Sequence, residues 1–543
     1  MEPIDRCGTL TYTRKGLVFL FAWLLWGDVC FQLMETIVPS ILPLKLKSLG
    51  ASNLAIGLIM TTLPAVFNTT VCPWVSFKSD RHRSRWGRRL PFILGTMPFL
   101  TAALLLIAYA DPIATWLHSA LFQDTSCTRS MVAIACLALF AGLFDLFNMF
   151  VNSVFWYLFN DVVPTQHLTR FMANFRLAAT LTSAFYNFVL FKYALSNMRE
   201  IYLSVALLYF LGFGLMCLKI KEGEYPPPDN AGQHPSLLRD IRVFAKECYT
   251  IPFYWNIFLY TTFTAMAACM GTYIVFFQQS LGLDLGQIGK LNGASLIVLA
   301  LCLLFIGNLV NLDRWHPVRI VMYTSLWGAV TGFNNLVWLF ADTPPTQVLF
   351  WVMIFSMLAW VPNSAVYQSA AAPREMHLFP RDRYGQFCGA QSLVRSVGTM
   401  VGGPLAGLFL DYIKRDYTHE PLFPYRYIYI WIGLFTCLAA LCNYRVYRTW
   451  KRLGAEEGYH PPTTTFRRAD QTLATKAPAA PKEPLILFGA MFIGSLVINA
   501  FWASYFQVMI PNAANVVLFG SMLVLLCLEF WLFLRLVRFA ERP

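Results

Sequence analysis

The chain has 543 residues, of which 57% are hydrophobic and only 13% are charged. A soluble protein usually carries about a quarter charged residues, so this composition excludes an ordinary soluble domain. The formal net charge of +13 does not point to nucleic acid, because cytoplasmic loops of membrane proteins retain Lys and Arg. Apolar runs of about 20 residues recur along the chain, and each is long enough to cross a hydrocarbon core of roughly 30 Å as a helix.

The segments that cross the lipid are expected to be helical, because backbone groups in lipid must be hydrogen-bonded within their own segment. The sequence therefore predicts an all-α, polytopic membrane protein. In chain order the predicted helices span approximately 17–43, 52–77, 91–110, 131–159, 168–195, 200–219, 252–279, 286–310, 317–341, 346–371, 383–411, 424–446, 486–508 and 514–537.

Two polar stretches divide these helices into groups of six, six and two, and six plus six is a known plan of secondary transporters. Most Lys and Arg fall inside if the N-terminus is cytoplasmic, so both termini of this multi-pass protein of the cell membrane are predicted to be cytoplasmic. The predicted parts are an N-terminal six-helix bundle (1–219), a cytoplasmic linker (220–251), a second six-helix bundle (252–446), a cytoplasmic polar segment (447–484) and a two-helix hairpin (485–543).

The sequence shows no pattern typical of an enzyme or of a cofactor site. The 13 Cys residues form no CxxC pair and the eight His residues do not cluster, so we expect no metal, cofactor or disulfide framework. No nucleotide-binding signature is present, and no nucleophile–base pair indicates catalysis. The first apolar run lacks a following small-residue cleavage site, so it is interpreted as a retained span rather than a signal peptide.

A basic motif follows the second predicted helix. It contains Asp80-Arg81 and then Arg85-Trp86-Gly87-Arg88-Arg89. The positive-inside rule alone would explain the basic residues but not their order. The motif resembles the signature of the major facilitator superfamily, and this resemblance implies a fold of two six-helix bundles, here with two additional C-terminal helices. We expect a cytoplasmic conformational latch in which Asp80 accepts charge-assisted hydrogen bonds from the arginines; its members are Asp80, Arg81, Arg85, Gly87, Arg88 and Arg89.

The longer pattern, Ser79-Asp80-Arg81, then Ser84-Arg85-Trp86-Gly87-Arg88-Arg89, then Pro91-Phe92-Ile93, resembles one branch of that superfamily. This branch contains the glycoside–pentoside–hexuronide:cation symporters and the sucrose transporters. The resemblance is strongest from about residue 50 to residue 176, continues in patches such as Asp313-Arg314, and does not extend to 447–543. It implies uptake of a sugar or glycoside by alternating access.

The fourth predicted helix carries the main candidate for proton coupling. Sucrose transporters have a helix-4 pattern of Asp, Asn three residues later, a substrate-binding Arg eleven later and a second Asp sixteen later. Asp145, Asn148 and Asp161 match this pattern, whereas Trp156 replaces the Arg. The resemblance thus implies that Asp145 carries the coupling proton, while the usual grip on sucrose is altered.

Physical chemistry supports the same assignment. A charge at mid-bilayer is costly and marks a functional candidate, and desolvation favours the protonated form of a carboxyl group. Asn148 and Asn152 lie near the face of Asp145, and we expect them, with Trp156, to contact the substrate. The alternative is that Asp145 forms a structural pair with an arginine of another helix.

Further candidates lie on other predicted helices. Asp28 and Glu35 share a face of the first helix, Asp28 as a second proton-coupling group and Glu35 as a substrate contact, unless Glu35 lies in water near the outer surface. Arg176 and Arg395 either bind an anionic substrate or pair with the carboxylates. A polar and aromatic stripe supplies two more candidate substrate contacts, although packing would also explain it; these are Asn363 and Gln368.

A proton is the expected coupling ion. Melibiose permease has two acidic residues in helix 2, and alignment on Pro73 places Cys72 and Asn68 at those positions. The sodium site of that relative is therefore expected to be absent. We predict a monomeric, proton-coupled symporter of a small solute, a sugar, that has no nucleic-acid partner and no cofactor. The alternatives are a carrier or exporter of another solute, including an anionic one, and a non-transporting sensor with the same fold.

Overall fold

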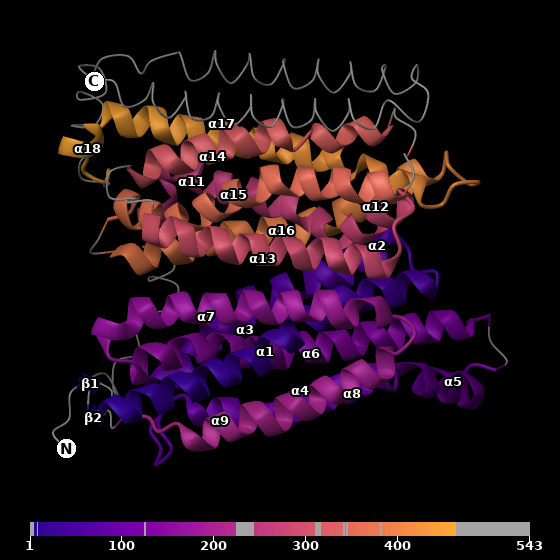
Figure 1. Ribbon diagram of the computed structural model, residues 1–543, viewed down its shortest axis with the longest axis horizontal. Helices are drawn as coiled ribbons and strands as arrows, with labels where there is room; N and C mark the ends of the chain where they lie inside the picture. Colours follow the sequence, from indigo (N-terminus) through magenta and orange to yellow (C-terminus); the bar gives the residue numbers. More distant parts are fainter. Residues whose placement is uncertain are drawn as a thin grey trace. The chain divides into compact units, whose positions relative to one another are not determined.

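The computed structural model describes residues 5–7, 9–123, 126–223, 244–309, 316–339, 343, 346–380 and 383–462. These residues are almost entirely helical (Figure 1), which confirms the predicted all-α fold class. Each segment predicted before residue 447 overlaps a helix. The two helices predicted at 486–508 and 514–537 lie outside the described residues.

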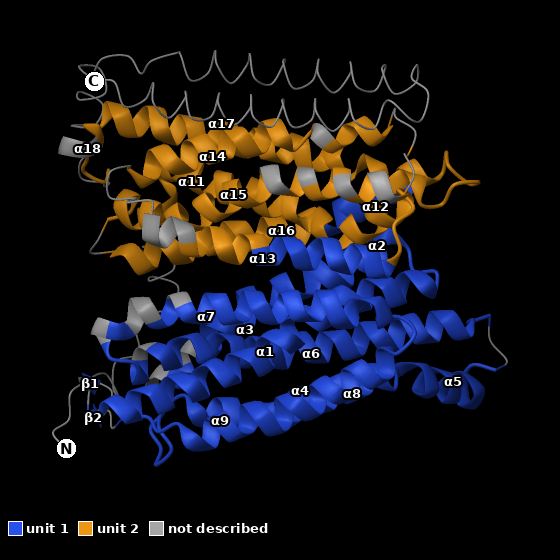
Figure 2. Ribbon diagram, in the orientation of Figure 1, with its two compact units in different colours: residues 1–233, 285–297, 403–411 blue, residues 234–284, 298–402, 412–543 orange. Residues whose placement is uncertain are grey.

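Two compact units divide the chain (Figure 2). The first contains residues 1–233, 285–297 and 403–411, and the second contains residues 234–284, 298–402 and 412–543. Parts of two long helices of the C-terminal half are thus counted with the first unit. The predicted boundaries of the two bundles and of the linkers stay predictions.

The first unit begins with a short β-hairpin and continues with helices. Asp5 of β1 pairs with Tyr12 of β2 in antiparallel register. Neither this hairpin nor helix α5 was expected from the hydrophobic pattern, because both are too short or too polar to resemble a span. The elements are β1 (Asp5–Cys7), β2 (Leu10–Tyr12), α1 (Arg14–Ser48), α2 (Asn53–Gly57), α3 (Leu63–Arg81), α4 (Leu90–Ala108), α5 (Ala110–Leu121), α6 (Arg129–Val162), α7 (Thr165–Phe185), α8 (Met198–Leu208) and α9 (Gly214–Lys219).

The second unit holds most of the remaining helices. Residues 285–297 of α13 and 403–411 of α16 are the parts that group with the first unit. The helices are α11 (Pro252–Ala268), α12 (Ile274–Ser280), α13 (Leu285–Leu309), α14 (Pro317–Thr331), α15 (Thr346–Leu378), α16 (Tyr384–Lys414), α17 (Ile428–Arg452) and α18 (Ala455–Gly458).

Nine helical segments within the described ranges are long and apolar enough to cross a membrane. Short π-helical or 3₁₀ turns interrupt some of them without ending the span, as between α2 and α3. This confirms an integral, multi-pass membrane protein. The nine segments are Arg14–Ser48, Asn53–Val75, Leu90–Ala108, Arg129–Phe159, Met198–Lys219, Pro252–Ser280, Leu285–Leu304, Tyr384–Lys414 and Phe423–Arg452.

Side-chain caps define where the helices that carry the site begin. The Thr13 hydroxyl accepts a hydrogen bond from the Gly16 N–H at 3.2 Å, and the Thr128 hydroxyl accepts one from the Met131 N–H at 3.3 Å. Such caps satisfy backbone donors that the first helical turn leaves open. They fix the starts of α1 and α6.

Aromatic packing holds α6 in the middle of the first unit. The Phe155 ring of α6 lies 4.8 Å from Phe159, 5.1 Å from Phe213 and 5.6 Å from Phe31 of α1, measured between centroids. All these rings are buried. The packing positions the polar residues one to three turns earlier on α6 against α1.

The C-terminal part of α16 (residues 403–411) packs closely against α2 within the first unit. The Asp411 carboxylate accepts hydrogen bonds from the N–H groups of Asn53 at 3.0 Å and Leu54 at 2.9 Å, where α2 begins. A Cβ atom on Gly407 would lie 2.4 Å from the Asn53 carbonyl oxygen. A glycine is therefore needed at this contact. The Asp411 carboxylate also interacts favourably with the positive end of the α2 helix dipole.

The second unit contains a cluster of histidine and aromatic rings, formed by His316, His377, Trp450 and Tyr459. The His316 ring lies 4.3 Å from the His377 ring and stacks on Trp450 at 4.6 Å. Its Nδ1 atom accepts a hydrogen bond from the Val318 N–H at 3.3 Å, which caps α14. The Tyr459 ring stacks on His377 at 5.2 Å, so the chain after α17 packs onto the same cluster.

His316 is expected to make the stability of this unit depend on pH. Burial, and secondarily His377 and Arg319, lowers the pKa of His316 to about 4. The unfolded chain, with a His pKa near 6.5, takes up the proton first, so stability is lost as pH falls from about 6.5 toward 4. Comparing Tm at pH 8 and pH 5, we expect a larger decrease in the wild type than in His316→Asn, whose amide oxygen can still cap α14. Equal decreases would contradict the assignment, and exposed His419→Asn is the matched control.

Candidate functional site

A buried polar contact joins α1 to α6 in the first unit. The Asn148 side chain is 3% exposed, and its Nδ2 atom donates a hydrogen bond to Glu35 Oε1. The Asp145 carboxyl lies near enough to Glu35 for the two to interact electrostatically. Three residues predicted separately on two helices therefore form one cluster, and Glu35 is held inside the unit by Asn148.

Asp28 is the other buried carboxyl on α1. It is 1% exposed, and its Oδ2 atom has no hydrogen-bond partner among the described residues. Its electrostatic neighbour is Arg176 of α7. Because Asp28 and Glu35 are seven residues apart, they project from the same face of the helix. The buried face of α1 thus presents two carboxyl groups to the interior of the unit.

Arg176 does not neutralise these groups by direct contact. Its side chain is exposed, and its guanidinium carbon lies 5.3 Å from the centroid of the Trp156 ring. Trp156 Nε1 donates a hydrogen bond to Asn152 Oδ1 at 3.0 Å. Among the described residues Arg176 forms no ion pair with Asp28 or Asp145. The structural alternative for Asp145, an interhelical arginine partner, therefore finds no support in this contact.

Hydroxyl and amide groups extend the polar region from α1 to α7. The Gln32 Nε2 atom donates to Ser183 Oγ at 3.2 Å and to Thr36 Oγ1 at 3.3 Å, and the two hydroxyls lie 2.9 Å apart. Sequence reasoning did not identify Thr36 and Ser183 as site residues, because isolated Ser and Thr are common in membrane helices. Thr36 lies one helical turn after Gln32, and this spacing was a signal in the sequence. Ser183 lies on α7, which only the fold brings next to α1.

The candidates of the second unit are less closely associated. Asn363 Nδ2 donates to the Thr324 carbonyl oxygen at 3.3 Å, while its buried Oδ1 has no partner in the described part of the chain. Gln368 is exposed and donates to Ser364 Oγ at 3.2 Å. Arg395 on α16 is exposed. Asn363 is thus the one of these three that is partly buried and has an unused acceptor.

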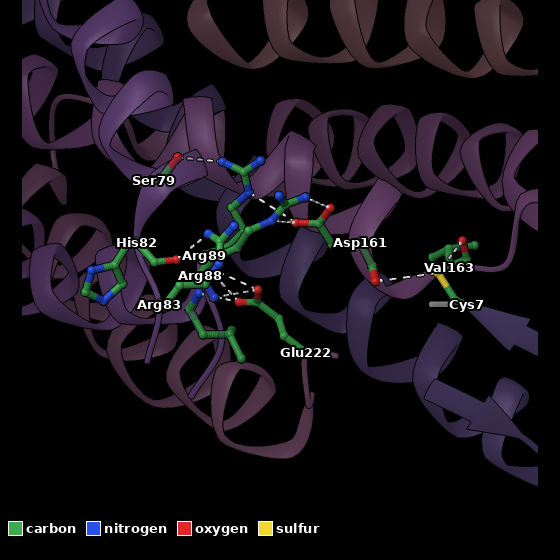
Figure 3. A network of polar contacts seen from close by, with 10 residues as sticks. Cys7, Ser79, His82, Arg83, Arg88, Arg89, Asp161, Val163 and Glu222 are labelled. Carbon is green, nitrogen blue, oxygen red and sulfur yellow. Dashed lines mark hydrogen bonds and ion pairs between the residues drawn. The ribbon is translucent and has the colours of Figure 1, made fainter. Parts of the chain in front are cut away.

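The basic motif between α3 and α4 forms an ion-pair network (Figure 3). Arg88 Nε donates to Asp161 Oδ2 at 2.8 Å, and a second nitrogen of Arg88 contacts Asp161 Oδ1. Arg89 Nε donates to the same carboxylate at 3.2 Å, and Arg89 Nη1 donates to Ser79 Oγ at 2.5 Å. Charge-assisted, two-point contacts of this kind are strong and directional. They connect the start of α4 with the end of α6.

Glu222, after α9, accepts hydrogen bonds from the backbone at the start of α4. The donors are the N–H groups of Arg88 at 2.9 Å, Arg89 at 2.9 Å and Leu90 at 2.6 Å. A carboxylate here also complements the positive end of the helix dipole. Burial raises the pKa of Glu222, and these three N–H groups oppose that effect. Glu222 thus completes a network with Arg88, Arg89 and Asp161, which we call the latch network.

The conformation of Gly87 makes room for this contact. Its φ angle is +101°, in the left-handed region that glycine adopts without strain. A Cβ atom at this position would lie 2.5 Å from Glu222 Cδ. Arg85 is exposed. The side chains of Asp80 and Arg81 lie outside the described residues, so their predicted part in the latch stays a prediction.

Two acceptors of the latch network were not predicted as members. Asp161 was noted only for its spacing from Asp145, and Glu222 falls within the predicted linker (220–251). Both are acidic residues at the ends of helices on the side where basic residues accumulate, and this was the available signal. The β-hairpin also contacts this region, since Cys7 Sγ lies 3.5 Å from the carbonyl oxygens of Asp161 and Val163 (Figure 3).

Solved structures of transporters share this fold at low sequence identity. The nucleoside transporter NupG is 12% identical, with a TM-score of 0.54 over 79% of this chain and 99% of that chain. A D-xylose-proton symporter is 12% identical, with a TM-score of 0.56 over 79% of this chain and 98% of that chain. A bacterial homolog of the human lysosomal transporter Spinster is 12% identical, with a TM-score of 0.54 over 80% and 98%. At such identities the likeness concerns the fold alone.

No curated protein matches this chain significantly. The family model of the Major Facilitator Superfamily, in contrast, matches residues 24–377 and 258–538. These matches cover most of the sequence and agree with the helical, membrane-spanning fold and with the motif after α3. The chain therefore belongs to the Major Facilitator Superfamily of membrane transporters.

Proposed function

We propose that this protein is a proton-coupled symporter that takes up a sugar or a glycoside by alternating access. The observation that carries the proposal is the cluster of Glu35, Asp145 and Asn148 in the first unit. Glu35 and Asp145 are each half-buried, and two carboxyl groups close together favour retention of a proton on one of them. Such a pair can load and release a proton without a metal or a cofactor.

Asn148 links protonation to solute binding in this proposal. Its Nδ2 atom donates to Glu35, and its buried Oδ1 atom has no partner among the described residues. A sugar hydroxyl is both a donor and an acceptor, so it can satisfy this oxygen. If Glu35 gains a proton, it needs the amide donor less, and Asn148 can turn its polar atoms toward the solute.

Asp28 is the second proton-coupling group that we propose. Its buried oxygen without a hydrogen-bond partner is costly as a free carboxylate, so a proton or an approaching cation stabilises it. Asn152 and Trp156 supply an amide and an aromatic face next to Arg176. Aromatic faces of this type pack well against the apolar face of a sugar ring.

The remaining candidates are substrate contacts in the second unit, namely Asn363, Gln368 and Arg395. Only Asn363 combines burial with an unused acceptor. The fold of a D-xylose-proton symporter is similar, which agrees with a sugar substrate and a proton. The fold of the nucleoside transporter NupG is equally similar, so nucleosides belong in the test panel.

A transport assay in proteoliposomes tests the proposal. Uptake of xylose, sucrose, a β-glycoside and a nucleoside is measured with an inward proton gradient, with no gradient and with a protonophore. We expect at least one sugar to accumulate only when the gradient is present. Uptake of a non-sugar solute alone would favour the rival carrier or exporter. Absence of any solute binding, with a partner protein captured on 447–543, would favour a sensor.

A further inference from the structure

Arg374 on α15 is a buried cation that the sequence pattern did not place inside a helix. The predicted helix ended at residue 371, whereas α15 continues to Leu378. The Arg374 side chain is 1% exposed. Its Nε and Nη2 atoms are buried and make no hydrogen bond with any described residue. Among the described residues, Arg374 is the one side chain with two buried polar atoms that lack a hydrogen-bond partner.

The neighbours of Arg374 among the described residues do not neutralise its charge. Its guanidinium carbon lies 4.6 Å from the centroid of the Tyr260 ring on α11, which is a favourable cation–π contact. The adjacent carboxylate, Glu375, accepts a hydrogen bond from Gln391 Nε2 at 2.8 Å instead. Among the described residues no carboxylate forms an ion pair with Arg374.

An arginine stays charged in a protein, and an uncompensated buried charge is strongly destabilising. The ring of Tyr260 offers only partial compensation, because an aromatic face carries no net charge. The N–H groups on these two nitrogen atoms are therefore suited to an acceptor that brings a negative charge. Since Tyr260 is itself 3% exposed, an acceptor at this place is shielded from bulk water.

Neighbouring side chains on α15 fit the same chemistry. Tyr367 is seven residues before Arg374 and Asn363 is eleven before it, so the three share one helix face. The Tyr367 phenol can donate a hydrogen bond to an anion. This face packs beside α14, where Asn363 contacts Thr324.

We propose that Arg374 is the centre of an anion-binding site that holds one monovalent anionic group. Its chemistry is that of a single negative charge accepting hydrogen bonds from the guanidinium, and both free chloride and the carboxylate of a solute supply it. The site is distinct from the carboxyl cluster of α1 and α6, and it does not require proton coupling. Arg374 differs from the exposed Arg176 and Arg395 in that its charge is buried.

Thermal unfolding of the purified full-length protein tests the site. Tm is measured in sodium HEPES at constant ionic strength while the buffer is exchanged for sodium chloride or for sodium glucuronate, with neutral glucose as the control solute. A ligand that binds only the folded state raises Tm in a saturable way. We expect a rise of about 2 °C or more with chloride if the ion is free, or with glucuronate alone if the anion is a solute carboxylate.

Matched variants connect this response to Arg374. Arg374→Gln removes the charge, and the anion-dependent rise should disappear. Arg374→Lys keeps the charge but loses the planar fork, so its half-saturating concentration should increase about tenfold. Arg415→Gln, which removes an exposed arginine just after α16, should respond like the wild type. If Arg374→Gln does not fold, the shift in Arg374→Lys decides.

Two results would overturn the site. One is a wild-type Tm that neither chloride nor glucuronate raises above the effect of HEPES and glucose. The other is an equal response in the wild type and in Arg374→Gln. A Glu375→Gln variant that abolishes the response while Arg374→Lys leaves it unchanged would also reject it, because Glu375 would then control the effect without Arg374.

Discussion

Asp145→Asn is expected to abolish accumulation of the solute against its gradient while leaving passive exchange of the solute intact. The amide keeps the size and hydrogen-bonding capacity of the side chain but cannot carry a proton. One proton moving with a neutral solute is driven by about 2.3 kcal/mol per 100 mV, which corresponds to about 50-fold accumulation. In the variant the accumulation ratio should fall to about 1, whereas counterflow of labelled solute should continue.

The measurement is uptake in proteoliposomes with an imposed potential and pH difference, compared with exchange at equal concentrations. Asp416→Asn removes an exposed carboxylate and serves as the matched control, with accumulation unchanged. Glu35→Gln should behave like Asp145→Asn if the two carboxyl groups share the proton. Undiminished accumulation in Asp145→Asn would assign the coupling to another residue or to no residue of this cluster.

Glu222→Ala is expected to disrupt the latch network and to lower both stability and transport. The carboxylate accepts hydrogen bonds from three backbone N–H groups at the start of α4, and alanine leaves these donors without an acceptor. Each unsatisfied buried donor costs about 1–3 kcal/mol. Glu222→Gln retains one carbonyl acceptor, so its loss should be smaller. The measured quantities are Tm and the initial rate of uptake.

A neighbouring variant controls for the position of Glu222 in the chain. Lys221→Ala alters an exposed residue beside it, and this variant should unfold and transport like the wild type. Asp161→Asn should weaken the same network by removing the anion that Arg88 and Arg89 contact. The role of the latch would be refuted by a Glu222→Ala protein that keeps both the wild-type Tm and the wild-type rate.

The motif after α3 shows what a linear pattern predicts and what it omits. The order of Gly87, Arg88 and Arg89 indicated a latch, since such charge patterns at helix ends form directional contacts. It did not indicate the acceptors, because Asp161 and Glu222 lie 73 and 134 residues from Arg88 along the chain. Only the packing of α4 against α6 and the return of the chain after α9 bring these carboxylates to the arginines.

The residues of the candidate site were likewise predictable from the sequence, whereas their contacts were not. Asp28, Glu35, Asp145 and Asn148 were identifiable because polar groups within apolar runs are rare and costly. The contacts between them could not be identified, because hydropathy does not specify how a helix is rotated about its axis. Arg374 lay beyond the predicted helix 346–371, because a basic residue after a proline at the end of an apolar run resembles a helix end. Only the tertiary structure shows that it is buried beside Tyr260.

The amino-acid sequence by itself determined the membrane environment, the helical class and the superfamily. These follow from the length of the apolar runs and from the lack of backbone partners in lipid, which are properties of local composition. The tertiary structure alone decided which polar groups meet: Asn148 with Glu35, Arg88 and Arg89 with Asp161, and Arg374 with the ring of Tyr260. Such pairs depend on the rotation and register of helices distant in sequence, and those are set by the close packing of many side chains at once.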